Sequence, residues 1–297
     1  MRTCVFVIIT FLIFSCGNNN NILPSSTGNK SDILVVASEL FWNNNKAKIK
    51  RIFEQPIRGL STLEPSFKII HVDHSAFKNI LKRSRNILIF EENIKSSIHK
   101  NKWAKNQLVV FLQANTNQTL DTERLNKTLK FFESNEIDLI KNEVKKKSNK
   151  SIAQDLHSNF SVKTFLPNIY TIVENQETFF WATYNPPKVE EIQHIMFFTV
   201  DSKSPNNTKC LNYTDSVISN NLFGTKENTY VTIEELYEPI CENNICRGLW
   251  KLENGFMGGP FIMKKYYLEN KTVISLGLIF APQKNKRNYV KTLEAIL

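Results

Sequence analysis

The sequence contains little glycine, proline or cysteine, and it has neither long apolar runs nor common catalytic motifs. Its 297 residues include nine glycines, ten prolines and five cysteines, too few for a collagen-like, proline-rich or disulfide-framework protein. No uninterrupted apolar run approaches the ~20 residues that span a bilayer. A Gly-rich phosphate loop, a G-x-S-x-G turn, an H-E-x-x-H pair and a C-x-x-C pair are all missing from the sequence. These absences exclude a multipass membrane protein and remove the strong enzyme signatures, so we predict neither a metal nor another cofactor.

The N-terminus has the pattern of a lipoprotein signal peptide. Arg2 precedes an apolar run over residues 4–14 that only Thr10 interrupts, and the run is too short to cross a membrane. Residues 13–16, Ile-Phe-Ser-Cys, resemble the lipobox of bacterial lipoproteins, in which the cysteine thiol is acylated and becomes the new N-terminus. Phe14 departs from the smaller residue usual at its position. We therefore predict a signal peptide over residues 1–15 and lipidation at Cys16, the alternative being an ordinary signal peptide with an incidental cysteine.

The residues that follow predict a flexible tether. Residues 16–32 are rich in Asn, Ser and Gly and have no hydrophobic periodicity, which is typical of linkers. Gly17 is not the acidic residue that commonly retains lipoproteins in the inner membrane, and no acidic cluster follows to direct surface export. By resemblance to lipoprotein sorting in general, this favours the periplasmic face of the outer membrane in a cell envelope.

The chain is basic, which bears on its partners. Lys and Arg total 38 against 28 Asp and Glu, a formal net charge of +10. The excess is densest in residues 78–85, 145–147 and 284–287. Such segments are most often solvated helix faces, but in an envelope they would also attract anionic lipid or wall polymers. The predicted partners are therefore the membrane, through the lipid anchor, and envelope proteins or anionic polymers, whereas the compartment excludes nucleic acid.

Hydrophobic patterning predicts an α+β fold in three parts. Residues 33–112 alternate short apolar runs with helical periodicity, which indicates an N-terminal α/β layer unit. Residues 113–160 predict one long amphipathic helix, begun by Thr119 or Asp121, that lies between the two halves. Residues 161–297 predict an antiparallel sheet packed with helices. We also expect a helix begun by Ser75, and a series of strands at residues 230–240, 246–252, 260–268 and 273–280 joined by hairpins.

Several segments together resemble one family of uncharacterised Bacteroidota envelope lipoproteins, a domain-of-unknown-function family. The segments are residues 23–28 ahead of 33–36, 75–81 with 85–89, 247–250, 256–261 and the ending 289–297. The resemblance covers almost the whole mature chain and implies an envelope lipoprotein, but it transfers no catalytic residue. The C-terminal half also resembles the PsbP-like α/β sandwiches of envelope lipoproteins, which is a resemblance of fold alone.

Glycines and an aromatic residue mark the candidate binding loop. Trp250, Gly255, Gly258, Gly259 and Pro260 follow one another closely, and adjacent glycines before a proline permit backbone conformations or close approaches that other residues do not. The segment is either a loop that contacts a ligand or partner, or a bulged strand that packs closely inside the fold. We favour the structural interpretation.

Two cysteines are placed for a disulfide. Cys241 and Cys246 flank four residues typical of a hairpin turn, and an oxidising compartment permits a bond between them. Directly opposed strand positions bring their β-carbons close enough, whereas a register slip of one residue would separate the thiols. Cys210 is left over and is expected to be free.

Two other patterns have structural explanations that we favour. His71, Asp73 and His74 carry metal-ligand chemistry, but alternation along a strand sends His74 to the opposite face, so a solvated strand end is expected and no metal site. Ser75 and Lys78 match the S-x-x-K nucleophile motif, yet the companion K-T-G is missing.

The missing motifs favour a non-enzymatic binding or scaffold module, and the alternative is an envelope hydrolase or transferase with an unrecognised active site.

Overall fold

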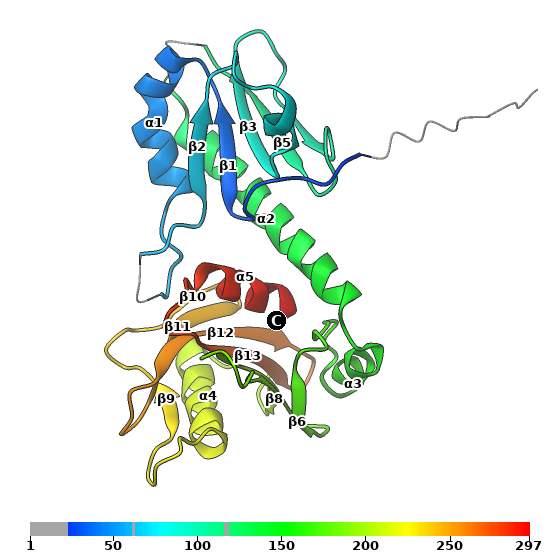
Figure 1. The fold of residues 1–297 in the computed structure, drawn as a ribbon. Helices are drawn as coiled ribbons and strands as arrows, with labels where there is room; N and C mark the ends of the chain where they lie inside the picture. Colours follow the sequence, from blue (N-terminus) through cyan, green and yellow to red (C-terminus); the bar gives the residue numbers. More distant parts are fainter. Residues whose placement is uncertain (1–22, 61–62, 116–118) are drawn as a thin grey trace, which may run out of the picture.

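The computed structural model describes residues 23–60, 63–115 and 119–297, which form two units joined by a long helix (Figure 1). The predicted α+β class, with an N-terminal α/β unit, a linking helix and a C-terminal antiparallel sheet, is confirmed. The predicted signal peptide and Cys16 lie outside the described residues. None of the described helices is long and apolar enough to cross a membrane.

The N-terminal unit is a five-stranded sheet in the order β2-β1-β3-β5-β4, in which only β4 is antiparallel to its neighbour. Its central strands are continuous apolar runs because parallel strands are buried on both faces. Helices α1 and α2 cover one face, and the loop with the 3₁₀ helix η1 covers the other. The elements are β1 (Asp32–Val36), α1 (Glu39–Phe53), β2 (Lys68–Val72), η1 (Asn79–Arg83), β3 (Asn86–Glu91), β4 (Ser97–Lys100) and β5 (Leu108–Gln113).

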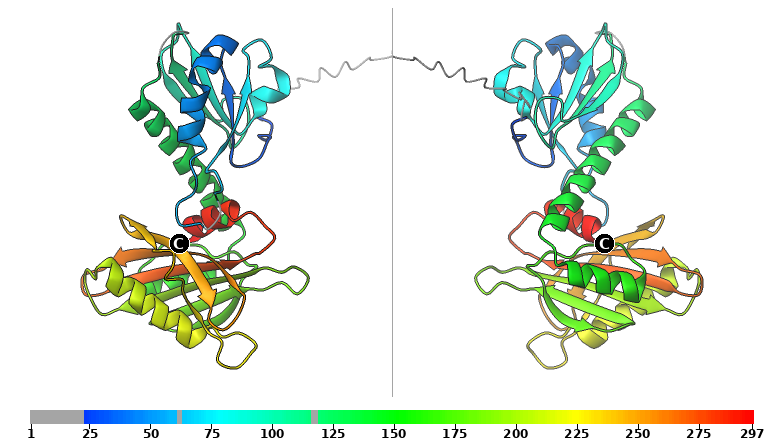
Figure 2. Two further views of the ribbon diagram at one scale, coloured as in Figure 1. Left: turned by 90° about the vertical axis from the view of Figure 1, so that its left-hand side faces the viewer. Right: turned by 90° about the vertical axis from the view of Figure 1, so that its right-hand side faces the viewer.

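The C-terminal unit is an antiparallel sheet in the order β10-β11-β12-β13-β8-β7-β6, with β9 paired to β11. Helix α4 packs on one face, and α3 and α5 pack on the face toward the N-terminal unit (Figure 2). The elements are α3 (Lys150–Phe160), β6 (Thr171–Asn175), β7 (Phe179–Tyr184), β8 (Ile192–Val200), α4 (Asn207–Asn221), β9 (Val231–Ile233), β10 (Ile240–Glu242), β11 (Ile245–Leu252), β12 (Gly258–Tyr267), β13 (Thr272–Phe280) and α5 (Arg287–Ile296).

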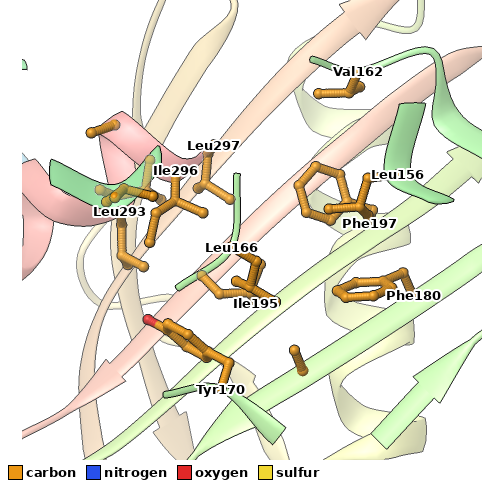
Figure 3. Packing of buried hydrophobic residues seen from close by; sticks show 14 of the residues in the cluster. Leu156, Val162, Leu166, Tyr170, Phe180, Ile195, Phe197, Leu293, Ile296 and Leu297 are labelled. Atoms are coloured by element: carbon orange, nitrogen blue, oxygen red, sulfur yellow. The ribbon is translucent and has the colours of Figure 1, made fainter. Parts of the chain in front are cut away.

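Alternating side chains of the C-terminal sheet form its core. Phe180, Ile195 and Phe197 point from neighbouring strands toward Leu156 of α3 and Leu293 of α5 (Figure 3). Each of these five side chains is almost fully buried. Because side chains alternate along a strand, the intervening residues of β8 reach the opposite face and pack against α4.

Helix α2 (Thr122–Lys146) contributes to both cores. Its N-terminal half packs Leu129 and Phe132 against the N-terminal sheet, and its C-terminal half packs Ile140 and Val144 against the C-terminal unit. Between these two apolar stretches the buried face carries Glu136, which is 4% exposed. The helix is therefore apolar where it serves each core and charged where the cores separate.

The helix predicted over residues 113–160 is wrong in its extent. Its start at Asp121 is confirmed, because α2 begins after this residue, whose carboxylate accepts hydrogen bonds from two backbone N–H groups of the first turn. A separate helix, α3, starts after Asn149, whose side chain accepts a hydrogen bond from the backbone N–H of Ser151 at 2.9 Å. An asparagine in this capping position begins a new helix, so the helix divides although the apolar periodicity continues.

Two further expectations are wrong. Ser75 does not begin an α-helix, because the Asp73 carboxylate accepts its backbone N–H at 2.8 Å and turns the chain, and only the short η1 follows. The strand expected over residues 230–240 is divided into β9 and β10 by a turn in which the Glu234 side chain accepts a backbone N–H.

Part of the predicted tether is packed. Residues 24–29 lie along the N-terminal unit, where the backbone N–H of Ser26 donates to the carbonyl of Lys105 at 3.1 Å. The N–H of Thr27 donates to the carbonyl of Arg83 at 2.8 Å. Paired backbone groups of this kind hold a polar segment in place without any hydrophobic periodicity.

Candidate functional site

The two units meet at a cleft of about 360 Å³, within the size range of small-molecule sites. Helix α2 supplies one side of the cleft, α5 with β10 and β11 supplies another, and the segment after α1 also lines it. Its lining residues are Gln55, Pro56, Ile57, Arg58, Ser66, Glu133, Ile137, Glu242, Arg247, Val290, Lys291 and Glu294. Half of these twelve carry a charge, so the boundary between the units is polar.

The segment after α1 approaches the C-terminal unit closely. Gly59 has a φ of +80°, a backbone conformation that favours glycine. A Cβ at this position would lie 2.6 Å from the Cβ of Arg247. Only glycine therefore allows this segment to reach β11 and to enclose the cleft from that side.

A buried ion pair joins the units beside the cleft. The Nζ of Lys291 in α5 donates to the Oε2 of Glu136 in α2 at 2.5 Å and to the carbonyl of Ser66 at 2.7 Å. It also lies 3.2 Å from the Oγ of Ser31, which donates to the other oxygen of Glu136 at 2.7 Å. Burial lowers the pKa of Lys291, and the charge of Glu136 opposes this shift. The partners are satisfied, which is the condition for burying charges without a large loss of stability.

The N-terminal unit also caps α5. The two carboxylate oxygens of Glu64 accept the backbone N–H groups of Lys286 at 2.7 Å and of Arg287 at 2.8 Å. These N–H groups lie at the start of α5, where a helix lacks internal partners and favours negative charge. Because Lys286 supplies no side-chain cap of its own, the helix depends on the other unit for this contact.

Two further ion pairs line the cleft. The Nε of Arg247 donates to the Oε1 of Glu294 at 2.8 Å, and both side chains are 19% exposed. Arg58 pairs with Glu242 across the two units, with both side chains more exposed. Together with the pair of Lys291 and Glu136, each of the three cations that line the cleft has a carboxylate partner.

Glu133 is the carboxylate that remains. It is half-buried on α2 and lines the cleft, and among the described residues no hydrogen bond or ion pair engages its side chain. Desolvation raises the pKa of Glu133, Lys291 and Arg247 act in the opposite direction, and Glu294 adds to the rise. A carboxyl group of this kind in a cleft is a candidate for ligand binding or for proton transfer.

Ser31 and Lys291 together have the residue types of a Ser-Lys hydrolase, but their placement does not suit catalysis. Ser31 is 1% exposed, and it does not line the cleft. Its hydroxyl donates to Glu136 rather than facing a substrate. The pair therefore belongs to the contact between the units.

The structure explains the candidate binding loop by packing. Trp250 is 5% exposed, and its indole N–H donates to the carbonyl of Ile279 at 3.2 Å. It lies opposite Gly259 in the β11–β12 ladder, where a Cβ would lie 2.0 Å from that same carbonyl oxygen. Gly258 likewise faces the carbonyl of Trp250, Gly255 faces the side chain of Leu252, and Pro260 is buried within β12. None of these five candidates lines the cleft.

The hairpin cysteines are bonded in the structure. Cys241 and Cys246 lie directly opposite each other in the β10–β11 ladder, with a Cα–Cα distance of 4.0 Å, and a disulfide joins them. Cys210 is free and buried under the sheet. The disulfide closes the hairpin that carries Glu242 and Arg247 into the cleft, so it is placed to hold the two residues in register.

The remaining candidates do not converge. The Nε2 of His71 lies 3.0 Å from the carbonyl of Ala37, and its ring stacks on Trp42 at 4.5 Å. His74 and Ser75 are exposed. In the part of the chain that the structure describes, no three His, Cys, Asp or Glu side chains are grouped as metal ligands.

Sequence reasoning missed the charged residues of the cleft, although one signal pointed to them. The apolar positions of α2 recur at intervals of three or four residues, and Glu136 occupies one of these positions between Phe132 and Ile140. A charge on an apolar stripe indicates a buried ion pair. The partner, Lys291, is 155 residues distant along the chain, so its contact could not be found from spacing.

Two family models match the chain. Residues 149–297 match the model described as Domain of unknown function (DUF4837), and residues 26–145 match Domain of unknown function (DUF8532). A search of curated proteins finds no match. The two matches meet between α2 and α3, so Glu133 and Glu136 fall in one match while Arg247, Lys291 and Glu294 fall in the other. The cleft is therefore built from both.

Proposed function

The chain belongs to the DUF4837 family of unknown function, and we propose that it is a lipid-anchored envelope protein that binds a small ligand in the cleft between its two units. The protein is a non-enzymatic binding or scaffold module, attached through Cys16 and facing the periplasm from the outer membrane. The observation that carries the binding role is the convergence of charged side chains from both units on one cleft of about 360 Å³.

The position of the cleft supports binding. A ligand there would contact α2 and α5 at the same time, and these helices come from opposite sides of the boundary. Binding would then favour one relative placement of the two units, because a ligand stabilises the arrangement that it contacts best. Such coupling suits a protein that reports a ligand to an envelope partner.

The ion pairs argue against catalysis. Arg247 and Glu294 engage each other, Lys291 engages Glu136, and the one serine near Lys291 with a suitable hydroxyl contact, Ser31, is buried. Among the residues that line the cleft, Glu133 is the one that favours a hydrolase or transferase, because its raised pKa suits a general acid. A reaction would need a second group beside it, and the other carboxylates that line the cleft are already paired.

Membrane attachment is proposed from the sequence. Arg2, the apolar run over residues 4–14 and the cysteine at position 16 support a lipoprotein signal. A clickable palmitate analogue supplied to growing cells should label the wild-type protein, and Cys16→Ser should lose the label and leave the membrane fraction. A Cys16→Ser protein that keeps both would refute the anchor.

Blocking the cleft tests the binding role. Gln55 is exposed and lines the cleft, so Gln55→Trp should obstruct it without disturbing a core. Gln154 is also exposed, on α3, and lies outside the cleft, which makes Gln154→Trp the matched control. The full-length protein should be screened against wall fragments, amino sugars and short peptides by thermal shift.

Ligands of the cleft should stabilise the wild type and Gln154→Trp but not Gln55→Trp. Stabilisation that survives in Gln55→Trp would place the ligand elsewhere. Turnover of a screened compound that is lost in Glu133→Gln would establish the hydrolase or transferase alternative instead.

A further inference from the structure

We infer that the ligand of this cleft presents a primary ammonium group, and that Glu133 is its counter-ion. The inference rests on the proposed binding function of the cleft and specifies the chemistry of its ligand. It follows from the charges that line the cleft, from the surroundings of Glu133 and from the neutral acceptors beside it.

The charges that line the cleft are paired except for one carboxylate. The cleft is lined by three cations, Arg58, Arg247 and Lys291. Each has its own carboxylate, since Arg58 pairs with Glu242, Arg247 with Glu294 and Lys291 with Glu136. After these pairs are counted, Glu133 is the carboxylate of the cleft that has no cationic partner. The cleft is therefore complementary to a ligand with one positive charge and not to an anion.

The cations nearest to Glu133 are engaged elsewhere or lie in another cavity. Arg287 on α5 directs its guanidinium to the carbonyl of Pro65 at 3.0 Å. Lys264 of β12 lines a separate cavity beside the C-terminus of α5. Lys291 has three acceptors within 3.2 Å, and Glu133 is not one of them. Among the described residues no cation is therefore in contact with Glu133.

Glu133 is partly desolvated in the folded protein. Burial raises the pKa of its carboxyl group, and Glu294 and Glu136 add to the rise while Lys291 and Arg247 oppose it. A half-buried carboxylate without a partner destabilises the fold. A bound ammonium group would supply the charge-assisted hydrogen bond that this carboxylate lacks in the free protein. The free energy of that hydrogen bond would then contribute to ligand binding.

The neutral acceptors of the cleft suit an ammonium group. Its three N–H donors need more acceptors than one carboxylate provides. The side chains of Gln55 and Ser66 line the same cleft, and no hydrogen bond engages the side-chain amide or hydroxyl among the residues described. The ligand class is therefore an amine on a compact polar molecule, such as a lysine side chain of a peptide or an amino sugar.

Matched pairs of amines and amides test the inference. The probes are Nα-acetyl-lysine amide and glucosamine, each beside its N-acetylated form, which differs by the loss of the charge. Binding to the full-length protein at pH 7 is measured by ligand-observed NMR titration. Glu133→Gln removes the charge at nearly constant shape, and Asp138→Asn on the exposed face of the same helix is the matched control.

At least one amine should bind the wild type about tenfold or more tightly than its amide, as expected for one charge-assisted hydrogen bond. Glu133→Gln should abolish this preference and Asp138→Asn should keep it. Equal binding of amine and amide, or an amine preference that persists in Glu133→Gln, would overturn the inference.

The failures of the two proposals can be told apart. If neutral or anionic compounds bind, lose their binding in Gln55→Trp and are indifferent to Glu133→Gln, the cleft is a binding site with another ligand class. If no bound compound is affected by Gln55→Trp, the binding function of the cleft is itself refuted.

Discussion

The two cores are held together by apolar packing, whereas the boundary between them is held together by paired charges, although helix α2 runs through all three regions. Phe132 of α2 is fully buried among the aromatic rings of Phe53 and Phe67. One turn further along the helix, Glu136 is also buried, with 4% of its surface exposed, and pairs with Lys291. Burial of apolar surface provides most of the stability of a fold, whereas a buried ion pair adds little beyond balancing its own desolvation. The boundary is therefore built for a particular arrangement of charges more than for stability.

The largest expected effect belongs to the core. Phe132→Ala would remove a side chain that contacts Phe53 of α1 and Phe67, the residue before β2, and the cavity left behind cannot be filled by rigid neighbours. We expect a loss of about 4 kcal/mol in the free energy of unfolding, measured by urea denaturation. A loss below about 1 kcal/mol would show that this end of α2 is not packed as described.

The boundary should respond differently, since its partners can be removed together. Lys291→Met leaves Glu136 buried without its cation, and we expect a loss of about 3 kcal/mol. Adding Glu136→Gln should recover most of this loss, because the uncompensated charge is then removed as well. If the double variant is as unstable as the single variant, charge pairing is not what closes the boundary.

The hairpin disulfide is expected to contribute less. Closing so short a loop limits the unfolded chain and stabilises the fold by about 2 kcal/mol in the chain-entropy description. Cys241→Ser with Cys246→Ser should lower the unfolding free energy by that amount. In the wild type, alkylation in denaturant without reductant should modify Cys210 alone among the three thiols that follow Cys16. Alkylation of all three would show that the bond does not form.

The elements that the sequence predicts well are those whose apolar residues are buried in a regular pattern. Strands β12 and β13 form where the runs over residues 260–268 and 273–280 predict them, because each of their faces packs on a different apolar layer. Strand β1 is a continuous apolar run because a parallel strand is buried on both sides. Edge strands β4 and β6 were missed because each is short and mostly polar, and because Ile98 and Val173 are exposed, so that neither strand has a buried apolar face. The break between α2 and α3 was missed because it depends on one cap, Asn149, within an unbroken helical periodicity.

The cleft could not be predicted from the sequence for a different reason. Glu133, Arg247 and Lys291 are distant in the chain and come together only when α5 docks against α2. Taken alone, each is an ordinary charged residue of a solvated surface. The glycines near Trp250 drew attention instead, and they serve the packing of β11 against β12 and β13.

The smallest expected effect concerns the unpaired carboxylate and depends on pH. The pKa of Glu133 in the folded state lies above its ordinary value of 4.5, so the folded state holds the proton more tightly than the unfolded chain does. Stability is then lost as the pH rises from about 4.5 through the folded-state pKa. Glu133→Gln should be as stable as the wild type below pH 4 and more stable at pH 7, by about 0.5 kcal/mol.

The free energy of unfolding of the wild type and of Glu133→Gln, measured at pH 7 with and without the amine that binds, tests the central claim most directly. We expect the variant to be the more stable protein without amine, and the amine to stabilise only the wild type. A variant that is less stable than the wild type, or that the amine stabilises equally, would show that Glu133 serves the fold and not a ligand.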